Sequence, residues 1–216
     1  MDFAQARYNM IEQQVRPWDV LDRKVLDTLE KLHREDFVPA DFRNLAFADI
    51  EIPIGYDQAM LDPKTEARLV QELDLTPDDK VLEVGTGSGF TTAMLASLAS
   101  HVDSVEIVPE LSIAADARLK SFDNITLHVG DAANGWGENE KWDAILLTGS
   151  VPVLPKAFSD MRNPGGRLVA VVGAEPIMTA TLTRNIGDGD WSEKELFDTV
   201  IPPLQNITAP AADFIL

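Results

Sequence analysis

The sequence contains no cysteine, which excludes disulfide bonds and thiolate metal ligands. It has only three histidines, His33, His101 and His128, which are too scattered to indicate a metal cluster, so we predict no metal site. Basic residues are also few: 18 lysines and arginines stand against 36 acidic residues, which gives a formal net charge of -18. Such a charge repels phosphate backbones and anionic membrane surfaces, so we expect neither nucleic acid nor a membrane as a partner.

Long hydrophobic runs are missing as well. No stretch approaches the roughly 20 apolar residues that a membrane-spanning helix needs, and the charged N-terminus lacks the apolar core of a signal peptide. These absences make the cytoplasm the default location. What the sequence does contain is 45% apolar residues in a chain of 216, which is enough for the core of one globular domain. We find no convincing linker and predict a single domain over residues 1–216, while the oligomeric state stays open.

The first part of this domain, residues 1–64, differs in pattern from the rest. Apolar side chains at helical spacing predict amphipathic helices over residues 3–15 and 20–33. Residues 34–65 mix charges and prolines with short apolar runs, which predicts a mostly irregular segment. Long ordered loops of this kind often carry function.

The second part, residues 65–204, alternates short apolar segments with helical ones. The predicted strands cover residues 80–84, 102–107, 125–129, 144–148 and 167–172, and the predicted helices cover 65–73, 89–99, 110–122 and 154–161. Strands that are apolar throughout and separated by helices indicate a parallel sheet buried on both faces. Two further segments, 177–186 and 194–202, flank a glycine-containing turn and indicate an antiparallel hairpin. The predicted fold class is therefore α/β: a doubly wound, mostly parallel sheet with an antiparallel C-terminal hairpin and added N-terminal helices.

A glycine-rich turn, Gly85-Thr86-Gly87-Ser88-Gly89, directly follows one predicted strand and precedes a predicted helix. Glycine permits the tight turn and the close approach of a ligand to the backbone, and in doubly wound sheets this position borders the cofactor crevice. Glycine also serves plain loop geometry, so the turn alone does not establish a binding site.

Acidic residues at the ends of the next two strands strengthen the prediction. Glu106 stands where a carboxylate can accept hydrogen bonds from both ribose hydroxyls of an adenosine. Asp131 can accept the exocyclic amine of an adenine placed between Ile107 and Ala132. Because the carboxyl ends of parallel strands meet at one edge of the sheet, the turn and the two acids together predict an adenosine-containing cofactor.

The glycine spacing then distinguishes between cofactors. A dinucleotide fingerprint requires its third small residue at position 90, which is Phe90, and no Lys-Ser or Lys-Thr pair follows the turn as in a P-loop. S-adenosylmethionine, which has no phosphate, fits better. Glu83, in the strand before the turn, is a candidate partner for the methionyl amine of this cofactor, although an acid that simply faces water is an equal alternative.

These features resemble the class I S-adenosylmethionine-dependent methyltransferases, and more narrowly the protein-L-isoaspartate O-methyltransferase family. The resemblance runs from Phe37 to about Leu204. It rests on short segments that follow one another along the chain. They are Ile52-Pro53-Ile54-Gly55, Val81 to Gly89, Val105 to Leu111, Gly130-Asp131, Gly135-Trp136, Asp143 to Thr148, and Pro164 to Val169.

The resemblance implies a Rossmann-like methyltransferase sheet that binds S-adenosyl-L-methionine over residues 65–204, with Thr148 added to the cofactor-binding residues. It implies methyl transfer to the carboxylate of L-isoaspartyl residues in damaged proteins, as a form of protein repair through an ester that collapses to a succinimide. The substrate loop then falls within residues 1–64. Its candidate residues are Asp57, Gln58, Met60, Leu61 and Asp62. No catalytic side chain is assigned, because an ionised carboxylate needs no general base.

The substrate loop departs from the family pattern. The family has a Thr-Ile-Ser type segment before the proline, and this chain has Ala59-Met60-Leu61-Asp62-Pro63, so Leu61 stands where a hydroxyl is expected. Two alternatives therefore remain open. One is a methyltransferase for a different acceptor, including a small molecule, and the other is a non-catalytic homologue that only binds the cofactor.

Overall fold

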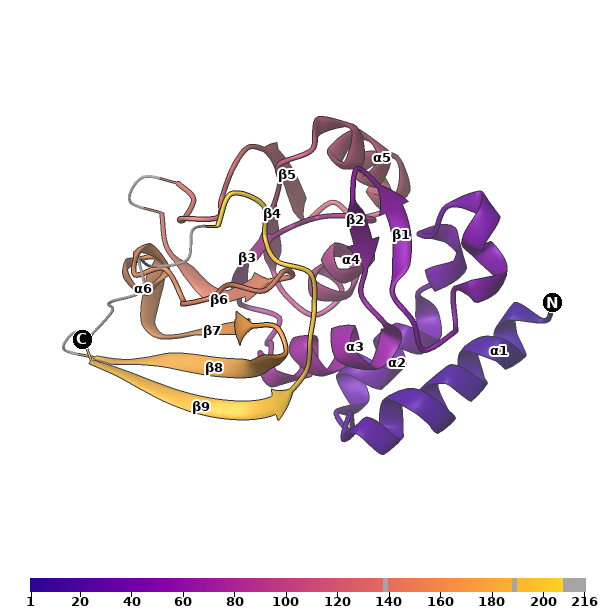
Figure 1. Ribbon diagram of the computed structural model, residues 1–216, viewed down its shortest axis with the longest axis horizontal. Coiled ribbons are helices and arrows are strands. Elements are labelled where there is room, and N and C mark those ends of the chain that lie inside the picture. Colours follow the sequence, from indigo (N-terminus) through magenta and orange to yellow (C-terminus); the bar gives the residue numbers. More distant parts are fainter. Residues whose placement is uncertain (138–139, 188–189, 208–216) are drawn as a thin grey trace.

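A seven-stranded sheet lies at the centre of the structure, a computed structural model that describes residues 1–137, 140–187 and 190–207 (Figure 1). The strands follow the order β5-β4-β3-β6-β7-β8-β9 across the sheet. Their bounds are β3 Lys80–Val84, β4 His101–Glu106, β5 Ile125–Val129, β6 Trp142–Leu147, β7 Arg162–Ala174, β8 Ile177–Gly187 and β9 Asp190–Asp198. Strands β3 to β7 pair in parallel, whereas β8 pairs antiparallel with β7 and β9. This arrangement confirms the predicted fold class.

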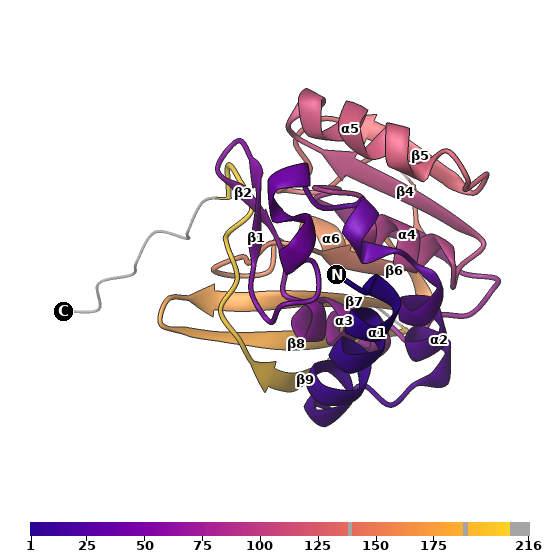
Figure 2. The same ribbon diagram turned by 90° about the vertical axis from the view of Figure 1, so that its right-hand side faces the viewer.

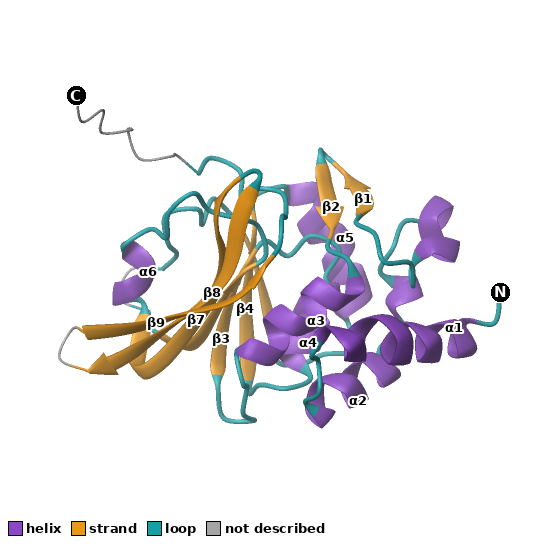
Figure 3. Cartoon of the chain, turned by 60° about the horizontal axis from the view of Figure 1, so that its bottom comes forward, coloured by secondary structure: helices purple, strands orange, loops and turns teal. Residues whose placement is uncertain are grey.

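Helices cover the two faces of the sheet unequally (Figure 3). Their bounds are α1 Phe3–Met10, α2 Arg23–Lys31, α3 Pro63–Glu72, α4 Phe90–Ala96, α5 Pro109–Leu119 and α6 Ala157–Asp160. The chain extends α1 through a π-helical stretch, Ile11–Val15, and a 3-10 turn, Arg16–Trp18, before it breaks at Asp19 in a left-handed conformation. Helices α1 to α5 pack on one face, and α6 packs on the other together with residues 132–136 and 204–207.

Two hydrophobic clusters, one on each face, explain why the central strands are apolar throughout. Neighbouring residues of a strand point to opposite faces, so Val81 packs into the cluster under α1 to α5 while Leu82 packs into the cluster under α6. Both side chains are fully buried. Strand β6 behaves in the same way, with Leu146 on the first face and Ile145 on the second.

Some elements differ from the sequence-based prediction. Residues 34–65, predicted to be mostly irregular, contain two short 3-10 helices, Arg34–Asp36 and Ala40–Leu45, and a hairpin of β1, Ile52–Gly55, and β2, Gln58–Met60. Strand β9 begins four residues before the predicted one, because its register is set by pairing with β8 rather than by its own pattern. Positions 188–189 of the predicted hairpin turn lie outside the described residues.

Two negative findings hold for the described part of the chain. No helix among these residues is long and apolar enough to cross a membrane. Within the same residues, no three His, Asp or Glu side chains are grouped so that they could hold a metal ion.

Candidate active site

A cavity opens at the carboxyl ends of β3, β4 and β5. The chain leaves β3 toward β4 and β5 on one side and later returns to β6 and β7 on the other, so this edge is the switch point where doubly wound sheets bind ligands. The cavity wall includes nine of the residues predicted from the sequence. These are Gln58, Leu61, Gly85, Gly87, Glu106, Ile107, Asp131, Ala132 and Thr148.

Thr148, which directly follows β6, holds the start of the glycine turn in place. Gly85 has a φ of +99°, and a Cβ added to it would lie 2.2 Å from the Thr148 hydroxyl oxygen. That hydroxyl donates to the backbone carbonyls of Val84 (2.9 Å) and Gly85 (2.8 Å). Glycine at position 85 is therefore required both for the backbone conformation and for the space beside Thr148.

Glu106 joins the end of β4 to the glycine turn. Glu106 is 4% exposed, and its carboxylate accepts the backbone N–H of Gly87 at 2.8 Å and that of Val108 at 3.0 Å. Each oxygen uses one lone pair in this way and keeps another for a further donor. Because Glu106 also lines the cavity, a ligand hydroxyl on that side meets an oriented carboxylate.

Asp131 and the residues after it form the opposite wall. The carboxylate of Asp131 accepts the backbone N–H of Ala133 and the side-chain amide of Asn206, both at 2.9 Å. Behind this wall the Trp136 ring packs on Gly130, where an added Cβ would lie 2.6 Å from the ring. The loop from Gly130 to Ala133 is thereby fixed in front of the sheet edge.

Glu83 does not line the cavity but lies behind the glycine turn, with its side chain fully buried. One carboxyl oxygen accepts the hydroxyls of Thr92 and Ser104, each at 2.5 Å, and Ser104 in turn lies 2.6 Å from the Thr86 hydroxyl. Among the described residues, no donor reaches the other oxygen. Burial raises the pKa of Glu83 to about 8, although the two hydroxyls oppose this rise.

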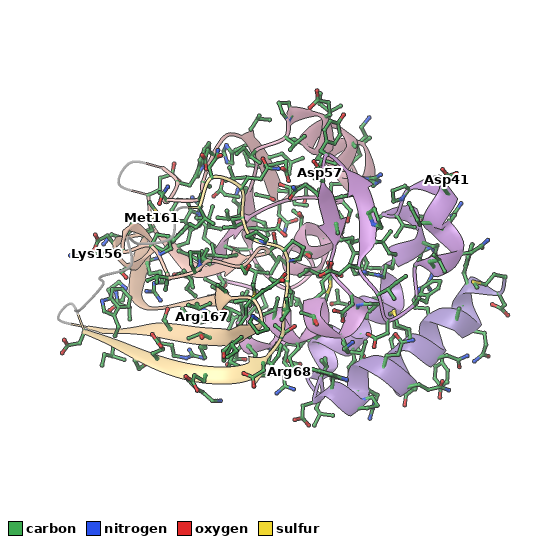
Figure 4. The ribbon with its side chains drawn as sticks, viewed as in Figure 1. Asp41, Asp57, Arg68, Lys156, Met161 and Arg167 are labelled. Atoms are coloured by element: carbon green, nitrogen blue, oxygen red, sulfur yellow. The ribbon has the colours of Figure 1, made fainter. Side chains whose placement is uncertain are left out.

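Three further predicted residues lie away from the cavity wall. Gly89 caps α4 and packs against α5, where an added Cβ would meet Ala115 and Leu119. Asp57 lies at the tip of the β1–β2 hairpin (Figure 4). Asp62 caps α3, where its carboxylate accepts the backbone N–H of Thr65 at 3.0 Å.

A second, smaller cavity adjoins the first beneath the hairpin. It brings together Thr86 and Ser88 of the turn with Met60 and Leu61, all predicted from the sequence. Glu66, which was not predicted, also lines it. The Glu66 carboxylate accepts hydrogen bonds from Arg34 and from the Thr91 hydroxyl, so a buried ion pair lies next to the smaller cavity.

Sequence analysis also missed the segment that follows β9. Residues 202–205 line the main cavity, because the backbone N–H of Leu204 donates to the carbonyl of Ser150 at 3.0 Å. Figure 2 shows this segment beside the β1–β2 hairpin. The segment has no periodicity, and its partner lies about 50 residues earlier in the chain, so no local signal marks it.

The sheet order, the glycine turn and the oriented acid at the end of β4 define an α/β fold of the methyltransferase class. Two solved structures share it. One is a protein-L-isoaspartate O-methyltransferase with a TM-score of 0.78 and 19% identity, matched over 91% of this chain and 65% of that chain. The other, from Plasmodium falciparum, is described as a protein-L-isoaspartate O-methyltransferase in complex with S-adenosyl-L-homocysteine; its TM-score is 0.79 at 18% identity, over 95% and 99% of the two chains.

The sequence comparisons identify the family. The family model of protein-L-isoaspartate(D-aspartate) O-methyltransferases matches residues 5–207. A protein-L-isoaspartate O-methyltransferase of Myxococcus xanthus is 41% identical over 71% of this chain and 74% of its own, and one of Rhodopseudomonas palustris is 36% identical over 90% and 91%. The chain belongs to this family. Membership confirms the predicted enzyme class, an S-adenosylmethionine-dependent methyltransferase.

Proposed function

We propose that this protein transfers the methyl group of S-adenosylmethionine to the carboxylate of L-isoaspartyl residues in damaged proteins. The observation that carries the proposal is the continuity of the main cavity. Its wall runs from Gly85 and Glu106 on the cofactor side to Gln58 and Leu61 of the substrate loop, so the residues proposed for the two reactants border one space. Family membership supports the choice of acceptor.

The charges on the wall suit this cofactor. We assign the ribose to Glu106 and the adenine to the space between Ile107 and Ala132, with Asp131 facing its amine. Among the described residues, the wall carries the carboxylates of Glu106 and Asp131 and no basic side chain. A cationic ligand is therefore attracted to it. We also propose that residues 1–64 and 65–204 act as the acceptor side and the cofactor core of one domain.

The residues of this chain contribute alignment rather than proton transfer. When bound, S-adenosylmethionine would supply an activated methyl group on sulfur for transfer to the acceptor oxygen, with S-adenosylhomocysteine as the leaving group. An ionised carboxylate attacks without a base, so the protein has to hold the two reactants in line and exclude water. The fixed backbone of the glycine turn aligns the reactants. Leu61, which is 6% exposed and lines both cavities, excludes water.

A radiolabelled methyl-transfer assay tests the proposal with an isoaspartyl peptide and its aspartyl counterpart. We expect transfer to the isoaspartyl peptide only, as a methyl ester that releases methanol at alkaline pH. Leu61→Ser should lower the KM for the peptide roughly 10-fold, because it adds a hydroxyl donor worth about 1 kcal/mol or more. Leu45→Ser, on an exposed 3-10 helix, is the matched control and should change nothing. Cofactor binding without transfer to the isoaspartyl peptide would contradict the proposal.

A further inference from the structure

The buried ion pair of Arg34 and Glu66 lies at the acceptor side of the site. Their side chains are 1% and 3% exposed. The guanidinium of Arg34 also donates to the carbonyl of Ala46 at 2.9 Å and to the carbonyl of Leu61 at 2.6 Å, and it stacks on Phe90 at 4.8 Å. Arg34 is therefore fixed by partners on several elements, one of which is the substrate loop.

The two members of the pair face the site differently. Glu66 lines the smaller cavity together with Leu61 and the glycine turn, whereas Arg34 lies behind it. Within the described part of the chain, Glu66 is the only charged side chain on that wall. An acceptor carboxylate that enters beside Leu61 thus meets the carboxylate of Glu66 first. The positive charge of Arg34 is already paired with Glu66.

Electrostatics at such a place depends on the sum of the charges, because two opposite charges in contact nearly cancel for a third charge that approaches both. A lone buried guanidinium near the acceptor would attract a carboxylate strongly. Burial raises the pKa of Glu66, while the charge of Arg34 and the Thr91 hydroxyl oppose this rise. Where Glu66 is ionised, most of the attraction of Arg34 for the acceptor is lost. Glu66 thus fixes Arg34, which donates to the carbonyl of Leu61, and also prevents Arg34 from making the subsite strongly positive.

We propose that Glu66 is a specificity-determining residue of the acceptor subsite, which by neutralising Arg34 makes recognition of the isoaspartyl residue depend on peptide shape rather than on the charge of its carboxylate. The inference rests on the proposed function, because it concerns the acceptor of the same site.

The wild-type protein provides the first test. The affinities of an isoaspartyl peptide and of its neutral α-carboxamide analogue are measured by calorimetric titration with S-adenosylhomocysteine present. We expect the two affinities to differ by less than about 3-fold, because the ionised Glu66 cancels most of the attraction of Arg34 for the carboxylate. A preference for the carboxylate of 10-fold or more in the wild type would overturn the proposal, and this result needs no variant that has to fold.

The variant Glu66→Gln provides the second test. Glutamine keeps the shape and an oxygen that accepts from Arg34 or Thr91, but it removes the negative charge. We expect the affinity for the isoaspartyl peptide to rise about 10-fold, the affinity for the carboxamide to stay the same, and the affinity for S-adenosylmethionine to change less than 2-fold. An unchanged or lower affinity of this folded variant for the isoaspartyl peptide would refute the proposal.

Glu35→Gln is the matched control. Glu35 is 4% exposed and pairs with Arg7 at 2.7 Å, so this substitution also takes one negative charge from a buried ion pair, but away from both cavities. Its peptide affinities should equal those of the wild type. Failure of the proposed function is distinct: it appears as absence of methyl transfer in the wild type, whereas the present inference is decided by the ratios of affinities. Wild-type protein that binds both peptides with the expected ratio but transfers no methyl group would support the inference while rejecting the function.

Discussion

Glu83→Gln should remove a large part of the pH dependence of stability. The pKa of Glu83 is raised from 4.5 to about 8 by burial, so the folded protein holds a proton that the unfolded chain releases. The free energy of unfolding therefore falls as pH rises from 4.5 to 8. At 1.36 kcal/mol for each pH unit, this one group accounts for roughly 4 kcal/mol over that window.

The assay is urea denaturation of the wild type and Glu83→Gln at several pH values from 5 to 8. Self-repulsion of a chain with a net charge of -18 also changes with pH, so the informative quantity is the difference between the two proteins at each pH. This difference should favour the wild type most at pH 5 and shrink as pH rises. Glu110→Gln, on the exposed first turn of α5, controls for the loss of one acid. Parallel curves for wild type and Glu83→Gln would refute the reasoning.

Two further substitutions separate the site from its scaffold. Gly85→Ala should weaken binding of S-adenosylmethionine at least 10-fold in calorimetry, because its Cβ would collide with Thr148. Gly165 also has a positive φ but open space around it, so Gly165→Ala should leave binding unchanged. Equal effects of the two substitutions on binding would contradict the collision. Arg167→Gln should lower the free energy of unfolding by about 3–5 kcal/mol in urea, because Asp79, which pairs with Arg167 at 2.6 Å, would be left as a buried unpaired charge; a loss below 1 kcal/mol would contradict this.

The side of the cavity formed by the glycine turn could be predicted because its signals are local. A glycine turn after an apolar strand, and acids at the ends of the next two strands, occur in chain order, and parallel pairing brings such ends together. Gly85, Glu106 and Asp131 accordingly line one cavity. The burial of Glu83 against Thr92 of α4 could not be predicted, because strand alternation alone does not tell which face of the strand α4 covers.

The side of the cavity formed by the β1–β2 hairpin could not be predicted to the same degree. Strands β1 and β2 are short and contain Pro53, so their composition indicates a loop, and only the pairing between them makes a hairpin. Arg34 and Glu66 are separated by more than 30 residues, and each alone is a residue type that is usually exposed to solvent. Their burial follows from packing of α3 and α4 against the N-terminal segment, which is not encoded in any single stretch of sequence.

The central claim is that the cavity at the ends of β3, β4 and β5 binds S-adenosylmethionine through the glycine turn and Glu106. Calorimetric titration of the cofactor into wild type, Glu106→Gln and Gly87→Trp tests it most directly, with Glu110→Gln as the matched surface variant. We predict that wild type and Glu110→Gln bind the cofactor and that Gly87→Trp does not bind it. Glu106→Gln should bind it 10- to 100-fold more weakly, a loss of about 1.5–3 kcal/mol in binding free energy. Unchanged binding by both Glu106→Gln and Gly87→Trp would contradict the claim.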